Sequence, residues 1–336
     1  MTAPQVITYS PAFTLVPTYE CFNRCTYCNF RTDPGQSPWL TLDAAAAQLS
    51  TLRQSGIIEI LILSGEVHPQ SARRRAWVEH IVQICELALE LGFLPHTNAG
   101  PLSYDEMAQL KQVNVSMGLM LEQITPRLQE TVHRHAPSKD PALRLQQLEW
   151  AGELRIPFTT GLLLGLGETE EEREETLKAI AASHQQWGHI QEVILQPYSP
   201  GQQEQWAGHG FEMEEMADVV AIARQILPNE ITIQIPPNLV QKPQHLRACL
   251  NSGARDLGGL VPYDHVNPDY THTSLNQLAE NLDAKTWALQ PRLPIYPGFD
   301  GWLSKALQKS VQDWRERLNG GYTDPIAAVI QKTQVI

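Results

Sequence analysis

The chain has 336 residues, and its 37 Asp and Glu outnumber its 25 Lys and Arg, which gives a formal net charge of −12. An acidic chain disfavours the broad phosphate contacts by which proteins bind nucleic acids, so we expect no nucleic-acid partner. We also expect no membrane partner, because no apolar stretch reaches the roughly 20 residues that a span needs. The N-terminus lacks the pattern of a signal peptide, and the cysteines fit a reducing compartment. Both features predict a cytoplasmic protein.

Short apolar runs alternate with longer amphipathic segments along the chain. The apolar runs lie at residues 13–18, 57–63, 93–97, 113–121, 158–166, 192–196, 231–235 and 257–261. Segments with helical periodicity lie between them, at 42–54, 71–91, 141–154, 170–186 and 213–226. Alternating strands and helices predict parallel βα units. About eight such units close an α/β fold of the (β/α)8 TIM-barrel type.

We expect residues 1–270 to form this barrel. Beyond residue 261 the chain becomes richer in Pro and Gly, and it ends in a predicted helix near 302–318. We expect residues 271–336 to be a short C-terminal helical extension packed on the barrel, so that the whole chain is a single domain. Chemistry in such barrels takes place at the C-terminal ends of the strands. The candidate site residues therefore follow the predicted strands.

Three cysteines, Cys21, Cys25 and Cys28, follow the first predicted strand in the string CFNRCTYC. Three thiolates hold three corners of a [4Fe–4S] cluster and leave the fourth iron open. A structural zinc site normally has four ligands, and an odd number of cysteines argues against disulfides. Zinc or idle thiols remain as alternatives. The other two cysteines, Cys85 and Cys249, lie in apolar helical stretches and are interpreted as buried hydrophobic residues.

The cysteine string resembles that of the radical SAM enzymes, in which the open iron chelates S-adenosylmethionine (SAM). The resemblance implies SAM as a second cofactor and includes Tyr27, just before the last cysteine, among the cofactor-binding residues. Ser64, Gly65 and Glu66 occupy the place of the family's Gly-Gly-Glu-like motif, where backbone carbonyls and the acid receive the SAM ammonium group. The alternative is a turn with a solvated glutamate at a helix start.

Further strand-end residues match the positions that bind SAM in this superfamily. Asn98 has an amide for the SAM ribose or for the substrate, and Glu122 has a carboxylate for both ribose hydroxyls. Arg144 resembles the arginine that many members direct at the SAM carboxylate, although a lone helical arginine often forms a surface ion pair. Gly165 and Gly167 allow close backbone approach to the adenine ring. The alternative for Asn98 is a satisfied polar residue at the top of the barrel.

Taken together, the strings resemble one radical SAM branch, the first subunit of the 7,8-didemethyl-8-hydroxy-5-deazariboflavin (FO) synthase family. They are CFNRCTYCNF, LSGEVHP, HTNAG, GLMLEQ, KDPALRL, IPFTTGLLLGLGET, IQIPPNL and GGLVPYDHVNP. The resemblance implies a radical SAM synthase that acts on a small-molecule substrate. This substrate is the 5-amino-5-(4-hydroxybenzyl)-6-(D-ribitylimino)-dihydrouracil adduct, whose central ring the enzyme closes with release of ammonia. The implied partners are FO synthase subunit 2, which makes the adduct, and a ferredoxin or flavodoxin as electron donor.

The last two predicted strand ends are crowded with polar residues. We expect Gln234, Asn238 and Asn267 to hold the substrate through hydrogen bonds, although Pro-rich turns are also common in ordinary loops. Ring closure requires a general base, and the sequence leaves three candidates: His96, Asp264 and His265. The HRHAP segment at 133–137 adds two histidines that we expect to be exposed.

Two other readings stay open from the sequence. One is a related small-molecule radical SAM enzyme, such as a tyrosine lyase or the sister subunit, which typically carries Gly-Gly where this chain has Gly65 and Glu66. The other is a non-catalytic iron–sulfur protein, which would have no need to concentrate polar residues at one end of a barrel.

Overall fold

The computed structural model describes residues 3–202, 206, 208–261 and 274–320. Eight strands form a closed parallel barrel: β1 (Gln5–Leu15), β2 (Glu59–Leu63), β3 (Leu94–Asn98), β4 (Ser116–Gly118), β5 (Phe158–Leu164), β6 (Ile190–Pro197), β7 (Thr232–Gln234) and β8 (Asp256–Leu260). Neighbouring strands pair in chain order from β2 to β8, β8 pairs with β1, and β1 pairs with β2. The predicted TIM-type barrel is confirmed.

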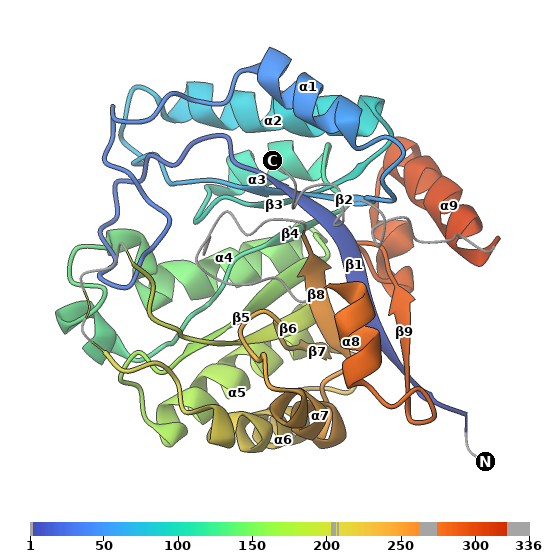
Figure 1. Ribbon diagram of the computed structural model, residues 1–336. Helices are drawn as coiled ribbons and strands as arrows, with labels where there is room; N and C mark the ends of the chain where they lie inside the picture. Colours follow the sequence, from blue (N-terminus) through green and yellow to red (C-terminus); the bar gives the residue numbers. More distant parts are fainter. Residues whose placement is uncertain (1–2, 203–205, 207, 262–273, 321–336) are drawn as a thin grey trace.

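Helices surround the barrel, as Figure 1 shows. They are α1 (Leu42–Thr51), α2 (Arg74–Glu90), α3 (Tyr104–Lys111), α4 (Pro141–Glu153), α5 (Glu170–Trp187), α6 (Met216–Ile226) and α7 (Pro243–Ser252). Short 3-10 turns lie at Pro126–Glu130, Pro137–Lys139, Met213–Glu215 and Pro297–Trp302. The sequence did not predict α3 or α7. Helix α3 has only eight residues, too few to show a clear helical period, and α7 begins at a proline that follows a Pro-rich stretch. None of the described helices has the length and apolarity to cross a membrane.

The first strand was predicted at 13–18, but β1 begins at Gln5. Its first half alternates apolar and polar residues instead of forming a continuous apolar run. Ile7 is fully buried among the surrounding helices, whereas Ser10 points inward and bonds the buried Glu59. The inside of the barrel is polar at this level, so the strand lacked the apolar signal on which the prediction relied.

The C-terminal segment closes the barrel end opposite the cysteines. Strand β9 (Trp287–Pro291) pairs in parallel with Gln5–Tyr9, the first half of β1. Downstream apolar residues pack against the starts of β2, β3 and β4, and Trp314 Nε1 in α9 (Lys305–Asn319) donates to the Gly92 carbonyl at 2.8 Å. Helix α8 (Leu275–Asn281) precedes β9. The expected boundary at residue 270 lies outside the described residues.

Arg292, just after β9, enters this end of the barrel and forms a polar floor. Its Nε donates to Asp256 at 2.6 Å, and a terminal nitrogen donates to Glu192 at 2.8 Å. Burial raises the pKa of the Glu192 carboxyl well above its ordinary value. Burial also acts to raise the pKa of Asp256, but Arg292 outweighs this effect and lowers the pKa overall. Pairing with Arg292 thus keeps Asp256 charged, as a buried charge requires, whereas burial favours the neutral form of Glu192.

Above this floor, solvent reaches the inside of the barrel. In β2 the inward Leu61 and Leu63 are partly exposed, while the outward Ile60 and Ile62 are fully buried. Strand β6 repeats the pattern, because Ile194 and Gln196 are partly exposed between buried neighbours. A TIM barrel whose interior is filled by side chains would bury these inward positions. The upper interior is therefore accessible to a small molecule.

Candidate active site

The cysteine loop, residues 21–28, follows β1 and is held from two sides by its backbone. Phe22 N donates to the Glu66 carbonyl at 3.0 Å, which ties the loop to the end of β2. Arg24 N donates to the His135 carbonyl at 2.7 Å, and Thr26 N donates to the Val132 carbonyl at 3.1 Å. The loop is thus fixed between the segments that follow β2 and β4.

The donor chemistry of this loop suits an iron–sulfur cluster. Cys21, Cys25 and Cys28 are partly exposed and form no disulfide. Burial raises the pKa of Cys21 to about 11 and that of Cys25 to about 12, so both stay protonated at neutral pH until metal binding displaces their protons. In the described part of the chain, no three His, Cys, Asp or Glu side chains converge as a single metal ion requires. In a cubane cluster each cysteine instead binds a different iron, so the three thiols need not converge on one point.

The loop after β2 lies directly against the cysteine loop. Gly65 N donates to the Thr18 carbonyl at 2.8 Å, and a Cβ at Gly65 would lie only 2.3 Å from the Glu20 carbonyl oxygen. Only glycine allows this approach. The Ser64 hydroxyl accepts a hydrogen bond from Trp77 Nε1 at 3.0 Å, so its side chain is directed toward α2. The backbone of this loop and Glu66 are therefore the groups presented to the site.

A cluster of buried charges lies beside these two loops. The Arg144 guanidinium is 3.9 Å from Glu66 Oε1 and 3.7 Å from Glu122 Oε1, and its side chain is 2% exposed. Lys139 Nζ also contacts the Glu122 carboxylate. Burial acts to raise the pKa of Glu122, but Lys139 and Arg144 outweigh it and lower the pKa overall. Arg144 is therefore not the surface ion pair that the sequence left as an alternative.

Tyr27 connects the cysteine loop to the segment after β4. Its hydroxyl lies 2.9 Å from His133 Nε2, and its ring lies 5.9 Å from Lys139 Nζ. His133 is buried, which lowers its pKa to about 3. The expectation that both histidines of HRHAP are exposed is therefore wrong for His133, while His135 is exposed. The contact with Tyr27 is tertiary, and so the local sequence gave no sign of it.

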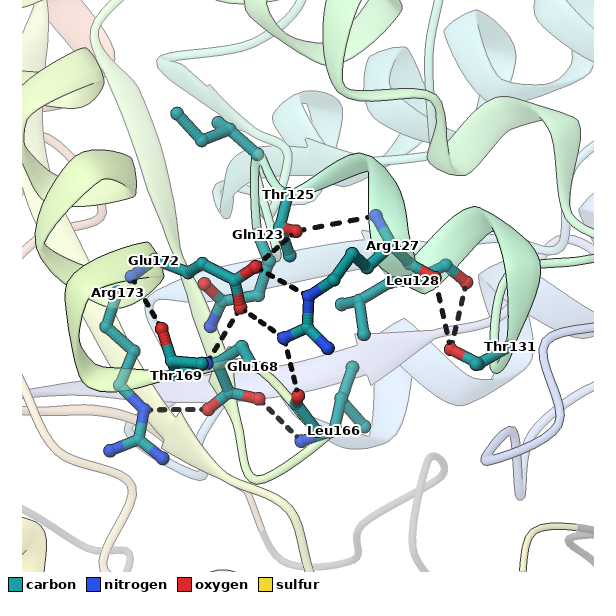
Figure 2. A network of polar contacts seen from close by, with 12 residues as sticks. Gln123, Thr125, Arg127, Leu128, Thr131, Leu166, Glu168, Thr169, Glu172 and Arg173 are labelled. Atoms are coloured by element: carbon teal, nitrogen blue, oxygen red, sulfur yellow. Dashed lines mark hydrogen bonds and ion pairs between the residues drawn. The ribbon is translucent and has the colours of Figure 1, made fainter.

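The loop after β5 is held by carboxylates, as Figure 2 shows. Gly165 and Gly167 have φ values of 90° and 106°, which favour glycine. Glu168 accepts hydrogen bonds from Gly165 N and Leu166 N, both at 2.7 Å, and from Arg173 Nε at 2.8 Å. Arg127 donates to the Gly167 carbonyl at 3.0 Å and pairs with Glu172.

This loop also lies close to the cysteines. Leu166 belongs to a small apolar cluster with Leu128, Val132 and Tyr198, and the Tyr27 ring packs against that cluster. The structure thus brings together the predicted residues of the cysteine loop, Glu66, Glu122, Arg144 and the β5 loop.

The remaining predicted residues are more dispersed. Asn98 ends β3 beside Leu63, and His96 lies two residues deeper in the barrel and is buried. The Gln234 amide donates to Glu192 at 3.1 Å, within the polar floor. Asn238 follows β7, and its carbonyl accepts from Gln241. Three predicted residues lie outside the described residues: Asp264, His265 and Asn267.

Three residues that the sequence did not single out also shape the site. The Asn23 amide donates to Glu66 at 3.0 Å and accepts from Ser138 N at 3.1 Å, so it connects three loops. Lys139 pairs with Glu122, and Glu168 holds the β5 loop. Asn23 lies inside the CFNRC string, and Lys139 begins KDPALRL. Each lies within a recognised string, but its role depends on a partner far away in the chain.

Comparison with known proteins places the chain in a family. The sequence profile described as the Radical SAM superfamily matches residues 15–180. The chain is 63% identical over 317 residues to the 7,8-didemethyl-8-hydroxy-5-deazariboflavin synthase of Trichormus variabilis, covering 94% of this chain and 93% of the relative. It is 59% identical over 314 residues to the enzyme of the same name from Gloeobacter violaceus, covering 94% of this chain and 97% of the relative.

Solved structures agree on the fold. The [FeFe]-hydrogenase maturase HydG from Carboxydothermus hydrogenoformans superposes with a TM-score of 0.72 at 18% identity, covering 98% of this chain and 82% of that one. Methylornithine synthase (PylB) gives a TM-score of 0.61 at 15% identity, covering 77% of this chain and 73% of that one. The chain is thus a radical SAM enzyme with a [4Fe–4S] cluster and SAM as cofactors, and it belongs to the 7,8-didemethyl-8-hydroxy-5-deazariboflavin synthase family.

Proposed function

We propose that this enzyme closes the central ring of the 5-amino-5-(4-hydroxybenzyl)-6-(D-ribitylimino)-dihydrouracil adduct, giving 7,8-didemethyl-8-hydroxy-5-deazariboflavin and ammonia. The observation that carries the proposal is the convergence of Glu66, Glu122 and Arg144 on a loop with three free cysteines, in a chain of this family. The relatives' names give the product. The accessible upper interior of the barrel supports a small-molecule substrate.

We assign the cofactor contacts residue by residue. Cys21, Cys25 and Cys28 hold the cluster, and the loop at Gly65 and Glu66 receives the SAM ammonium group. The buried Glu122 and Arg144 and the partly exposed Lys139 suit the ribose hydroxyls and the carboxylate of SAM, because opposite charges are already paired there. The adenine ring fits beside the Tyr27 loop and the backbone of Gly165 and Gly167, and Ser64 and Asn98 complete the set through their backbone and amide groups.

When bound, the cluster and SAM supply the electron and the 5′-deoxyadenosyl radical that remove the benzylic hydrogen of the adduct. The chain's own residues orient the adduct and keep water away. Gln234, Asn238 and Asn267 are the proposed substrate contacts. Ring closure also releases ammonia, protons and one electron, which would return to the oxidised cluster, and His96, Asp264 and His265 are the candidates to accept the protons. Burial lowers the pKa of His96 to about 3, so this ring is better suited to accepting a hydrogen bond than to keeping a proton. Asp264 and His265 are then the remaining candidates to hold the proton released on ring closure.

The test uses anaerobically purified enzyme with reductant, SAM and the synthetic adduct. We expect iron and sulfide in the protein, methionine and 5′-deoxyadenosine as coproducts, and a fluorescent deazaflavin. The Cys25→Ala variant should lose the cluster and all products. SAM cleavage by the wild type without deazaflavin would contradict the proposed substrate. Consumption of free tyrosine with a diaminouracil, giving the adduct, would favour the sister activity.

We also propose a ferredoxin or flavodoxin as electron donor, because positive groups surround the cysteines of this acidic protein. The Arg24 side chain is 64% exposed although it pairs with Asp33 at 3.1 Å, and Arg134, which precedes the His135 backbone bonded by Arg24 N, is also exposed. Reversing two charges, in an Arg24→Glu and Arg134→Glu double variant, should slow reduction by an acidic flavodoxin and leave reduction by dithionite unchanged. Equal rates with flavodoxin would contradict this assignment.

Two further expectations belong to the same proposal. FO synthase subunit 2 makes the adduct by joining tyrosine, the source of the 4-hydroxybenzyl group, to a ribitylated diaminouracil. A cytoplasmic location suits the five free cysteines of the chain, because a reducing compartment keeps them as thiols.

A further inference from the structure

The protonation of His96 can be read from its hydrogen-bond partners. His96 Nδ1 lies 2.7 Å from the Ser116 hydroxyl oxygen, and that oxygen lies 2.7 Å from the Pro294 carbonyl oxygen. A carbonyl has no hydrogen to donate, so the single hydroxyl hydrogen of Ser116 points to Pro294. Ser116 must then accept its other bond, and only an Nδ1–H of His96 can donate it.

The second ring nitrogen is left as an acceptor. The ring is neutral, because burial and the nearby Arg292 lower the pKa of His96 to about 3. A neutral imidazole carries one hydrogen, so Nε2 holds a lone pair. A Cβ at Gly118 of the neighbouring strand would lie 2.9 Å from this nitrogen, and the absence of a side chain there keeps the space beside it open. Gly118 and His96 lie on the inward side of the barrel, above the Arg292 floor.

We propose that Ser116 and Pro294 are positioning residues that lock His96 in the Nδ1–H form, so that its Nε2 accepts a hydrogen bond from an N–H or O–H group of the substrate. The proposal rests on the proposed function and deepens it, because the pyrimidinedione and polyol parts of the adduct are rich in such donors. Pro294 belongs to the segment after β9, which also supplies Arg292. The C-terminal segment thus sets the hydrogen-bonding character of a residue inside the barrel.

Nitrogen NMR of the anaerobic holoenzyme, labelled with ¹⁵N-histidine, tests the tautomer directly. The His96 signal is assigned by its loss in His96→Gln. We expect an unprotonated Nε2 in the wild type and a mixture of tautomers in Ser116→Ala, where the hydroxyl acceptor is missing. A protonated Nε2 in the wild type would overturn the proposal, whether or not any variant folds.

Two amide variants separate the two nitrogens of the ring. His96→Asn keeps a donor for Ser116 but has no group at the Nε2 position, whereas His96→Gln offers an acceptor near that position. We expect KM for the adduct to rise about tenfold or more in His96→Asn, the size of a lost hydrogen bond, and less in His96→Gln. Gly118→Ala, which crowds Nε2, should also raise KM. Thr97→Val is the matched control, because it removes a buried hydroxyl bond on the outer side of the same strand.

An unchanged KM in both His96→Asn and Gly118→Ala would contradict the substrate contact. The failure of the proposed function is distinguishable from this result. A wild type that forms no deazaflavin would reject the adduct as substrate, but the NMR experiment on the tautomer would stand unaffected.

Discussion

The Asn23 side-chain amide donates a hydrogen bond to Glu66 Oε2 at 3.0 Å, although the two residues lie 43 positions apart in the chain. The same nitrogen lies 3.7 Å from Cys21 Sγ, and the amide oxygen accepts from Ser138 N. One short side chain thus joins the cysteine loop to the end of β2 and to the turn before α4. These three segments carry the groups assigned to the cluster and to SAM.

Asn23→Ala should therefore loosen the site and destabilise the protein. The change leaves the Ser138 N–H unsatisfied and removes the hydrogen bond that Glu66 accepts from Asn23, and an unsatisfied buried group costs about 1–3 kcal/mol. We expect a lower midpoint of thermal unfolding in the metal-free protein, together with less iron retained after reconstitution. Asn251→Ala, at an exposed position of α7, is the comparison for iron retention. A wild-type iron content and midpoint in Asn23→Ala would show that the bridge does not hold the loops.

Glu122→Gln should destabilise the protein by about 3 kcal/mol, because removing one partner leaves buried charges uncompensated. Lys139 and Arg144 both approach this carboxylate. The double variant with Lys139→Met should recover part of the lost stability. Chemical denaturation of the wild type, the two single variants and the double variant gives the coupling free energy between Glu122 and Lys139.

The difference between wild type and Glu122→Gln should also depend on pH. The folded-state pKa of Glu122 lies below its ordinary value of 4.5, so its contribution is complete above the unfolded pKa and is lost as the pH falls through the folded value. The two proteins should thus differ most near neutral pH and converge in acid. A difference that grows below pH 4.5 would reject the assigned charge state.

Gly65→Ala should be far more damaging than Gly167→Ala. A Cβ at Gly65 meets a backbone carbonyl at 2.3 Å, whereas no atom lies within 4 Å of a Cβ at Gly167. The backbone at Gly65 must shift, which moves the β2 loop away from the cysteines. At Gly167 only the positive φ is strained, at a cost of about 1 kcal/mol. Thermal unfolding and iron content compare the two, and equal losses would contradict the close approach.

Arg292→Met should destabilise the barrel floor strongly. The variant leaves Asp256 and Glu192 without their cation, and the loss for a buried pair is about 3–5 kcal/mol. Arg292→Lys should destabilise the protein less than Arg292→Met, although a lysine ammonium cannot bond both carboxyl groups as the planar guanidinium does. Arg255→Met, whose guanidinium bonds backbone carbonyls, serves as the control. Denaturant unfolding measures the stability of all three variants. A loss of less than about 1 kcal/mol in Arg292→Met would show that Arg292 does not balance the charge of the floor.

The sequence by itself determined the class of fold and the chemistry of the cysteine loop. The alternation of apolar runs with amphipathic segments is a local periodicity, and the spacing of the thiols is also a local property. The fold class and the cluster chemistry can therefore be predicted without tertiary information. The same holds for Gly65 and Arg144, whose strings match a family pattern. The start of β1 was missed because its inward residues are polar. These polar residues face the end of the barrel that Arg292 enters, which only the tertiary structure shows.

Only the tertiary structure decided which groups meet. Three of the contacts join segments far apart in the chain: Asn23 with Glu66, Lys139 with Glu122, and His96 with Ser116 and Pro294. Burial then sets their charge states, as the lowered pKa of His133 and of His96 shows. Desolvation and pairing depend on what surrounds a side chain in space. For that reason a histidine that reads as exposed in the sequence lies buried against Tyr27 in the folded protein.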